Sequence, residues 1–215
     1  AWSERGNLLR ERHQLEEAAC CFEKALALGG DPELNGYYLA SVRDGDTPTT
    51  PPRRYVEALF DDYAADFQSH LVEELGYRGF EELLQPLVDQ GKRYRHVLDL
   101  GCGTGLCGPL IAPQADTIDG VDISSGMLEQ ARKLGVYREL IHADLGEFLA
   151  ATALRVDLIL AADVFIYVGE LATIFRSLRR ILEPGGCLAF TVELAEEGRD
   201  IQLLPSLRYA HSEAY

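Results

Sequence analysis

The chain has 215 residues, of which 35 are Asp or Glu and 20 are Lys or Arg, so its formal net charge at pH 7 is −15. This length accommodates one sizeable domain and one small one. The negative charge repels phosphate backbones and argues against a nucleic-acid partner. The sequence has no signal peptide and no apolar run of about 18 residues, the length that crosses a bilayer. We therefore expect a soluble protein without a membrane partner.

The cysteines show neither the spacing of a zinc site nor that of a disulfide framework. Unpaired thiols of this kind suit a reducing compartment. We therefore expect a cytoplasmic protein with no metal site. The cysteines are Cys20, Cys21, Cys102, Cys107 and Cys187.

The first 45 residues predict a small all-α region. Small and apolar residues recur there at the spacing of two packed helices, and Asp31 followed by Pro32 favours the start of a third helix. The recurring residues are Trp2, Gly6, Leu9, Ala18, Phe22 and Ala25. They resemble the tetratricopeptide repeat, which implies a helical hairpin that binds a protein partner. The alternative is a helical hairpin that only packs on the rest of the chain.

Residues 46–54 are rich in Asp, Thr and Pro and predict a linker. Residues 55–94, which follow, predict a helical lid, because apolar residues recur at steps of three and four after Tyr55. These residues are Phe60, Tyr63, Phe67 and Leu71. The other interpretation of this stripe is the core face of an ordinary helix.

The most informative segment begins at Val97 and ends at Gly105. A continuous apolar run around Asp99 predicts a buried parallel strand, which ends at Gly101. Glycine lets the backbone approach a ligand closely. The helix expected from Leu106 directs its free N–H groups to the same place. A strand, a glycine turn and a helix N-terminus together predict a nucleotide site.

Two kinds of ligand compete for this turn. The G-x-G-x-x-G spacing of dinucleotide binding is met by residues 103–108, and Asp122 lies about 20 residues further on. In that frame Gly101 closes the strand two residues too early, and Asp99 would repel a pyrophosphate. A ligand with an amino group and a sulfonium would be attracted to Asp99. We therefore favour the cationic ligand and keep an NAD-dependent oxidoreductase as an alternative.

Strand-like runs and helical patterns alternate over the rest of the chain. Strands are expected at residues 95–100, 117–122, 139–143, 156–162 and 187–192. Helices are expected at residues 106–114, 125–134, 145–153 and 170–182. This alternation predicts an α/β fold with a doubly wound, mostly parallel sheet. The first four strands end at Asp99, Asp122, Asp144 and Asp163, at the edge where such sheets bind ligands.

The successive motifs resemble those of class I S-adenosylmethionine-dependent methyltransferases, in the order and at the spacing of that family. They lie at residues 97–105, 120–124, 142–145, 157–163 and 182–186. The resemblance implies a Rossmann-like fold, S-adenosylmethionine as the cofactor and S-adenosylhomocysteine as the product. A further likeness to tetratricopeptide-containing and trans-aconitate-type methyltransferases implies a small-molecule acceptor.

The resemblance also implies a role for each residue at the sheet edge. The methionine part of the cofactor would lie against Asp99, Gly101, Cys102 and Gly103. Asp122 would accept hydrogen bonds from both ribose hydroxyls, a task that suits a carboxylate. Its alternative role is to cap the following helix.

The adenine would pack on Ile123 and Met127, with its amino group on Asp144 and Leu145 as an apolar neighbour. Capping of the next helix is the alternative role for Asp144, and a place in the core is the alternative for Met127. Asp163 would lie beneath the sulfonium and the acceptor.

Lid tyrosines, Tyr55 and Tyr63, would close over the cofactor carboxylate and exclude water. Tyr63 and His211 are the candidate catalytic residues. A general base is needed for an alcohol or amine acceptor but not for a carboxylate. The other polar groups that the acceptor could meet are His70, Tyr167, Arg208 and Tyr209.

The sequence thus predicts O- or N-methylation of a small organic acceptor. The alternatives are an aminopropyltransferase, the oxidoreductase, and a tetratricopeptide scaffold that binds the cofactor without catalysis. Similar enzymes extend the sheet after residue 193 by a helix and two strands, for which residues 194–215 are too few. We therefore expect a methyltransferase domain over residues 55–215, with its core at 95–193 and truncated C-terminal strands.

Overall fold

The computed structural model describes residues 1–43, 45–64 and 76–215. Contacts between residues divide the chain into two compact units, which we describe one at a time. The larger unit comprises Val56–Phe165 and Leu171–Thr191. The smaller unit comprises Ala1–Tyr55, Ile166–Glu170 and Val192–Tyr215.

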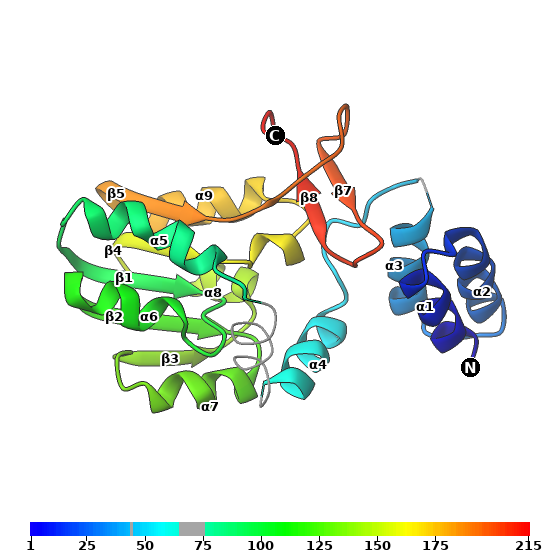
Figure 1. Cartoon of the computed structure of the whole chain (residues 1–215), viewed down its shortest axis with the longest axis horizontal. Coiled ribbons are helices and arrows are strands. Elements are labelled where there is room, and N and C mark those ends of the chain that lie inside the picture. Colours follow the sequence, from blue (N-terminus) through cyan, green and yellow to red (C-terminus); the bar gives the residue numbers. More distant parts are fainter. Residues whose placement is uncertain (44, 65–75) are drawn as a thin grey trace. The chain divides into compact units, whose positions relative to one another are not determined.

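A parallel β-sheet forms the centre of the larger unit (Figure 1). Its strands are β1 (Tyr94–Leu100), β2 (Ala115–Asp122), β3 (Glu139–His142), β4 (Val156–Ala161) and β5 (Leu182–Phe190). Their order across the sheet is β3-β2-β1-β4-β5, and every neighbouring pair is parallel. The chain therefore winds outward from β1 in both directions. This arrangement confirms the predicted α/β fold with a parallel sheet.

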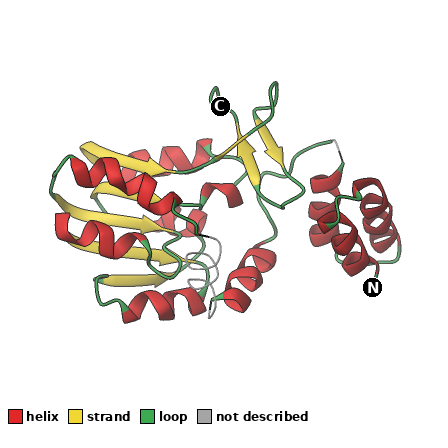
Figure 2. Ribbon diagram, viewed as in Figure 1, coloured by secondary structure: helices red, strands yellow, loops and turns green. Residues whose placement is uncertain are grey.

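Helices connect the strands and cover the sheet (Figure 2). They are α5 (Gly79–Asp89), α6 (Cys107–Ile111), α7 (Ser125–Lys133), α8 (Leu145–Ala151) and α9 (Ala172–Ile181), with short 3-10 helices η2 (Ala112–Gln114) and η3 (Phe165–Tyr167). A further helix, α4 (Arg53–Tyr63), precedes them in the chain and contacts the N-terminus of α7. In this unit α5 contacts α6, and α8 contacts α9. The two pairs lie on opposite faces of the sheet in Figure 1, so the central strands are covered on both sides.

The central strands are buried because their apolar runs face helices on both sides. Val97, Leu98 and Leu100 of β1 are 0% exposed, and so are Leu158, Ile159 and Leu160 of β4. The expected strands agree with the observed ones to within two residues, except that β5 starts at residue 182 instead of 187. Its pairing with β4 is irregular near its start, where the register shifts.

Helix α5 is a core element, although it lies within the range 55–94 that was expected to form a lid. Phe80, Leu84 and Leu87 recur at steps of four and three and are almost fully buried. They pack in one cluster with Val97 of β1 and Leu158 of β4. Their burial stabilises the sheet and keeps α5 on it.

Three helices form the N-terminal part of the smaller unit: α1 (Trp2–Glu11), α2 (Leu15–Ala27) and α3 (Pro32–Val42). The side chain of Asp31 accepts hydrogen bonds from the N–H groups of Glu33 and Leu34, which confirms the predicted start of α3. Helices α1 and α2 approach closely at Gly6, where a Cβ atom would lie 2.4 Å from the ring of Phe22. The tetratricopeptide assignment itself stays a prediction.

Residues that follow β5 form a second, small sheet in the smaller unit. Its strands are β6 (Glu193–Leu194), β7 (Ile201–Leu203) and β8 (Tyr209–His211), in the order β6-β8-β7. β8 pairs parallel to β6 and antiparallel to β7. Apolar residues of this sheet and its turns share one buried cluster with α2 and α3; they are Leu203, Leu207 and Tyr209.

The two contact units do not coincide with the ranges 1–45, 46–54 and 55–215 expected from the sequence. Residues 192–215 group with the N-terminal helices because their apolar side chains are buried there. The functional boundaries of the domains stay a prediction. Among the described residues, no helix combines the length and the apolar character that crossing a bilayer requires.

Candidate functional site

The glycine turn after β1 has the positive φ angles that its glycines predict. Gly101, Gly103 and Gly105 adopt φ angles of +56°, +53° and +89°, which residues with a Cβ atom disfavour. At Gly101 a Cβ atom would also lie 2.5 Å from Cγ2 of Val164. At Gly103 a Cβ atom would meet no atom within 4 Å. The turn therefore exposes bare backbone to open space at Gly103, where a ligand can approach.

Asp122, at the end of β2, is held next to this turn by two backbone donors. Its Oδ2 accepts a hydrogen bond from the N–H of Gly103 at 2.8 Å, and its Oδ1 accepts one from the N–H of Ser124 at 2.8 Å. Burial raises the pKa of Asp122, while these backbone donors and the nearby His142 oppose the rise. Each carboxylate oxygen keeps a further lone pair for a ligand hydroxyl.

Asp99 forms a buried pair with a residue that the sequence did not single out. The hydroxyl of Tyr137 donates a hydrogen bond to Oδ2 of Asp99 at 2.7 Å. Burial raises the pKa of Asp99 to about 7, although this hydrogen bond lowers it. The carboxylate of Asp99, expected to be charged at the end of β1, is therefore partly protonated near neutral pH.

Tyr137 fits against the sheet because three glycines leave room for its ring. A Cβ atom on Gly105, Gly108 or Gly120 would lie 3.0, 2.8 or 3.2 Å from atoms of Tyr137. The glycines are visible in the sequence, but nothing in the sequence assigns the space beside them to Tyr137. Their number in this region exceeds what a single turn needs, and the surplus provides the space for the ring.

Cys102 occupies the interior of the turn rather than its ligand side. It is 7% exposed, and its Sγ packs against Gly120. Its N–H donates to the carbonyl oxygen of Val121 at 3.0 Å. Burial raises the pKa of its thiol well above the ordinary value, and so do the nearby Asp99 and Asp122. Its carbonyl oxygen accepts from the N–H of Gly105 at 2.8 Å, so the role of Cys102 toward a ligand stays a prediction.

The adenine candidates divide between capping and core positions. Asp144 caps α8, because its Oδ1 accepts from the N–H of Glu147 at 3.0 Å. Leu145 and Ile123 are half-buried. Met127 is 1% exposed and so lies in the core in this structure. Roles of these residues toward adenine stay predictions.

Asp163 follows β4 in a left-handed conformation, with φ of +56°. Its N–H donates to Oγ1 of Thr191 at 2.7 Å, and the Thr191 hydroxyl donates to its Oδ1 at 3.0 Å. Asp163 also forms a hydrogen bond with Tyr77, and burial together with this bond raises the pKa of Tyr77. Thr191 and Tyr77 were both missed, because they are distant in sequence from the strand end that they support.

The candidate lid and catalytic residues belong to the smaller unit or have side chains outside the described residues. Tyr55 belongs to the smaller unit, where its ring is 5.7 Å from that of Tyr37. The side chain of Tyr63 and the whole of His70 lie outside the described residues. His211 is 2% exposed, and its Nε2 lies 2.9 Å from the carbonyl oxygen of Gly169, an acceptor that requires a proton on Nε2. The catalytic roles of Tyr63 and His211 stay predictions.

Three further polar candidates also belong to the smaller unit. Tyr167 forms a hydrogen bond with Arg208, whose pKa is raised by Tyr167 and Glu193 against the opposing effect of burial. Tyr209 is fully buried, and burial raises its pKa. Among the described residues, no group of three or more His, Cys, Asp or Glu side chains could hold a metal ion.

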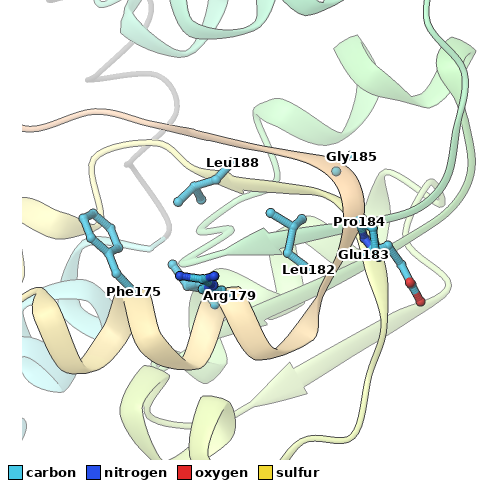
Figure 3. A pocket seen from close by; sticks show the side chains of 9 residues that line it. Phe175, Arg179, Leu182, Glu183, Pro184, Gly185 and Leu188 are labelled. Carbon is cyan, nitrogen blue, oxygen red and sulfur yellow. The ribbon is translucent and has the colours of Figure 1, made fainter.

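A separate hollow of about 470 Å³ lies between α9 and the edge strand β5 (Figure 3). Phe175, Leu182 and Leu188 line it, with Arg179 and Glu183 at its polar parts. None of the residues predicted to bind a ligand belongs to this hollow.

Comparison with known proteins identifies the larger unit. The model of a family described as "Methyltransferase domain" matches residues 97–186, which contain the glycine turn and all four strand-end aspartates. Residues 97–186 thus form a methyltransferase domain, which is similar to those of the class I S-adenosylmethionine-dependent methyltransferases. The sheet order β3-β2-β1-β4-β5 and the position of Asp122 beside the turn agree with that assignment.

Relatives of the methyltransferase domain act on different acceptors. A malonyl-[acyl-carrier protein] O-methyltransferase of Legionella pneumophila is 33% identical over 166 residues, which are 73% of this chain and 56% of the relative. A trans-aconitate 2-methyltransferase of Pseudomonas paraeruginosa is 38% identical over 96 residues, which are 43% of this chain and 34% of the relative. The chain thus spans about half the length of the first of these relatives and about a third of the length of the second.

A solved structure supports the fold of the methyltransferase domain. The complex of DhpI with S-adenosylhomocysteine (SAH) has a TM-score of 0.60 and 19% sequence identity. The similarity covers 75% of this chain and 82% of DhpI.

Proposed function

We propose that the methyltransferase domain binds S-adenosylmethionine at the carboxyl edge of its sheet and transfers the methyl group to a small organic acceptor. The observation that carries this proposal is the placement of Asp122. Its two oxygens are fixed by Gly103 and Ser124, immediately beside the open backbone at Gly103. A carboxylate held in this way offers two acceptors to the two hydroxyls of a ribose.

The other residues of the edge complete the proposed cofactor site. Gly101, Cys102 and Gly103 present backbone to the methionine part, and Asp99, when ionised, attracts the amino group and the sulfonium. On the same proposal the adenine lies near Ile123, Met127, Asp144 and Leu145, and Asp163 lies near the reacting methyl group. These assignments rest on the match of each position to the family motifs.

Methyl transfer asks the protein mainly for alignment. Bound S-adenosylmethionine supplies a methyl group that its positive sulfur already activates for in-line displacement. The S–CH₃ bond breaks and its electron pair stays on sulfur, while an acceptor lone pair forms the new bond to carbon. Correct alignment contributes roughly 7–11 kcal/mol to such reactions in the best cases. Water is the competing nucleophile, so a closed site also favours the intended acceptor.

The acceptor is, on this proposal, a carboxylic acid that becomes a methyl ester. The malonyl-[acyl-carrier protein] and trans-aconitate enzymes act on carboxylates, and these are the relatives that the domain resembles. An ionised carboxylate attacks without a general base. If the acceptor is an alcohol or an amine, Tyr63 and His211 are our candidates for the base. In His211 the nitrogen with the free lone pair is Nδ1, which is buried and has no hydrogen-bond partner among the described residues.

Calorimetric titration with S-adenosylmethionine, S-adenosylhomocysteine and NAD in parallel tests the cofactor. We expect micromolar binding of the first two compounds and none of NAD. Binding of NAD alone would overturn the proposal. Incubation with methyl-labelled S-adenosylmethionine and a panel of di- and tricarboxylic acids, free and as acyl-carrier-protein thioesters, then tests the acceptor. We expect base-labile label, as in a methyl ester, whereas label on an amine or an alcohol would refute the carboxylate.

A protein partner for residues 1–45 belongs to the same proposal. On this proposal the partner contacts apolar side chains that the N-terminal helices leave exposed, among them Leu8 on α1 and Leu28 after α2, which are 57% and 73% exposed. The double variant Leu8→Asp, Leu28→Asp should leave cofactor binding unchanged. If instead it abolishes cofactor binding, these residues serve the domain rather than a partner.

A further inference from the structure

Helix α4 is attached to the N-terminus of α7 by one carboxylate. Oδ1 of Asp61 accepts a hydrogen bond from the hydroxyl of Ser124 at 2.5 Å and a second from the N–H of Gly126 at 3.3 Å. Ser124 is the capping residue of α7, since its Oγ also accepts from the N–H of Met127 at 3.1 Å. Asp61 therefore adds a negative charge to the positive end of α7.

The same contact requires a bare backbone on α7. A Cβ atom on Gly126 would lie 3.0 Å from Cβ of Ala64 and 3.6 Å from Oδ1 of Asp61. Ala64, directly after α4, is 5% exposed. Gly126 thus lets the end of α4 lie directly on the first turn of α7.

Ser124 joins this contact to the proposed ribose site. Its side chain donates to Asp61, while its N–H donates to Oδ1 of Asp122 at 2.8 Å. Asp122 in turn accepts from Gly103 of the glycine turn. Ser124 is 0% exposed, so its two donors have little freedom to find other partners. One buried residue therefore connects α4 to the carboxylate that would hold the cofactor.

We infer that Asp61 is a positioning residue that docks α4 on the turn at residues 122–126 and so slows the exchange of the bound nucleoside; this rests on the proposed function. When the hydrogen bonds of Asp61 break, the hydroxyl of Ser124 loses its acceptor and α4 loses its polar attachment to α7. The turn that carries Asp122 is then free to open. A bound nucleoside leaves faster from the open turn, whereas the bonds that it makes with Asp122 are unchanged.

The dissociation rate of S-adenosylhomocysteine from the full chain tests this inference, measured by stopped-flow displacement alongside the equilibrium affinity. Asp61→Ala should raise the dissociation rate on the order of tenfold, the lower end of what a charge-assisted hydrogen bond contributes, because Asp61 is exposed. Asp61→Asn keeps an accepting oxygen without the charge and should recover part of the loss. Gly126→Ala keeps the charge but crowds Ala64, and it should also speed release.

Asp31→Ala is the matched control, because the carboxylate of Asp31 likewise accepts from N–H groups in the first turn of a helix, in the N-terminal segment. It should cost similar stability and leave the dissociation rate unchanged. If Asp61→Ala releases the ligand within twofold of the natural rate, Asp61 only caps α7 and the inference is wrong. If the unaltered chain fails to bind S-adenosylhomocysteine, the proposed function fails instead, so the two failures are distinct.

Discussion

The buried carboxyl of Asp99 should make the stability of the chain depend on pH in a direction opposite to that of most acidic residues. Its pKa is about 7 in the folded chain against 3.8 as the ordinary value, so the folded state holds the proton more tightly than the unfolded state does. The contribution of Asp99 to stability is therefore greatest below about pH 4 and decreases as the pH rises to about 7. Above that pH both states are ionised and the loss is complete.

The size of this loss follows from the shift. The difference between 3.8 and about 7 is roughly three units. Each unit corresponds to about 1.4 kcal/mol, so ionised Asp99 costs about 4 kcal/mol of folding free energy above neutral pH. Asp99→Asn replaces the carboxyl by a neutral group of the same shape that still accepts from Tyr137. The variant should gain stability over the natural chain progressively between about pH 4 and about pH 7.

Urea unfolding followed by far-ultraviolet circular dichroism, at intervals across this pH range, measures the gain. Tryptophan fluorescence is unsuitable because Trp2, the one tryptophan of the chain, lies in α1 outside the domain. A difference between the two proteins that is the same at about pH 5 and about pH 8 would refute the reasoning. Tyr137→Phe removes a hydrogen bond that lowers the pKa of Asp99, and it should extend the loss of stability above pH 7.

Other substitutions test the site and the core. Asp122→Ala should weaken S-adenosylmethionine binding by about 1.5–3 kcal/mol for each charged hydrogen bond lost, and unchanged affinity in calorimetry would remove the ribose assignment. Gly101→Ala should destabilise the chain by at least about 1–2 kcal/mol in urea unfolding, because of its positive φ angle and the clash with Val164; equal stability would show that the turn relaxes. Asp119→Asn should cost about 2–3 kcal/mol, because this fully buried carboxylate accepts from Arg138. Phe22→Ala should cost about 3–5 kcal/mol locally, seen as a lower midpoint in Trp2 fluorescence.

Strands and their terminal aspartates were predictable because their signals are local. The apolar run before Asp99 and the one before Asp163 are long enough to be recognised as buried strands, and the glycine turn fixes where the first one ends. Parallel strands then bring their carboxyl ends to one edge. The placement of Asp122 beside Gly103 follows from the pairing of β1 with β2 alone.

Contacts between residues far apart in sequence were not predictable. Tyr137 is 38 residues from Asp99, and Thr191 is 28 residues from Asp163, so no periodic pattern connects either pair. The strands of the second sheet have two or three residues each, too few to show an alternation. The role of Asp61 was hidden for the same reason, because its partner Ser124 lies 63 residues away.

The buried thiol in the glycine turn has a consequence for the chemistry of the protein. Thiolates, not thiols, react with alkylating and oxidising reagents, and burial raises the pKa of both Cys102 and Cys107. The turn is therefore inert toward maleimides and peroxide at neutral pH while the domain is folded. Cys20 on α2 is exposed and reacts first. In a Cys187→Ala variant, which lacks the half-exposed thiol of β5, a single dye or cross-linker can thus be attached to the N-terminal helices while the proposed cofactor site stays untouched.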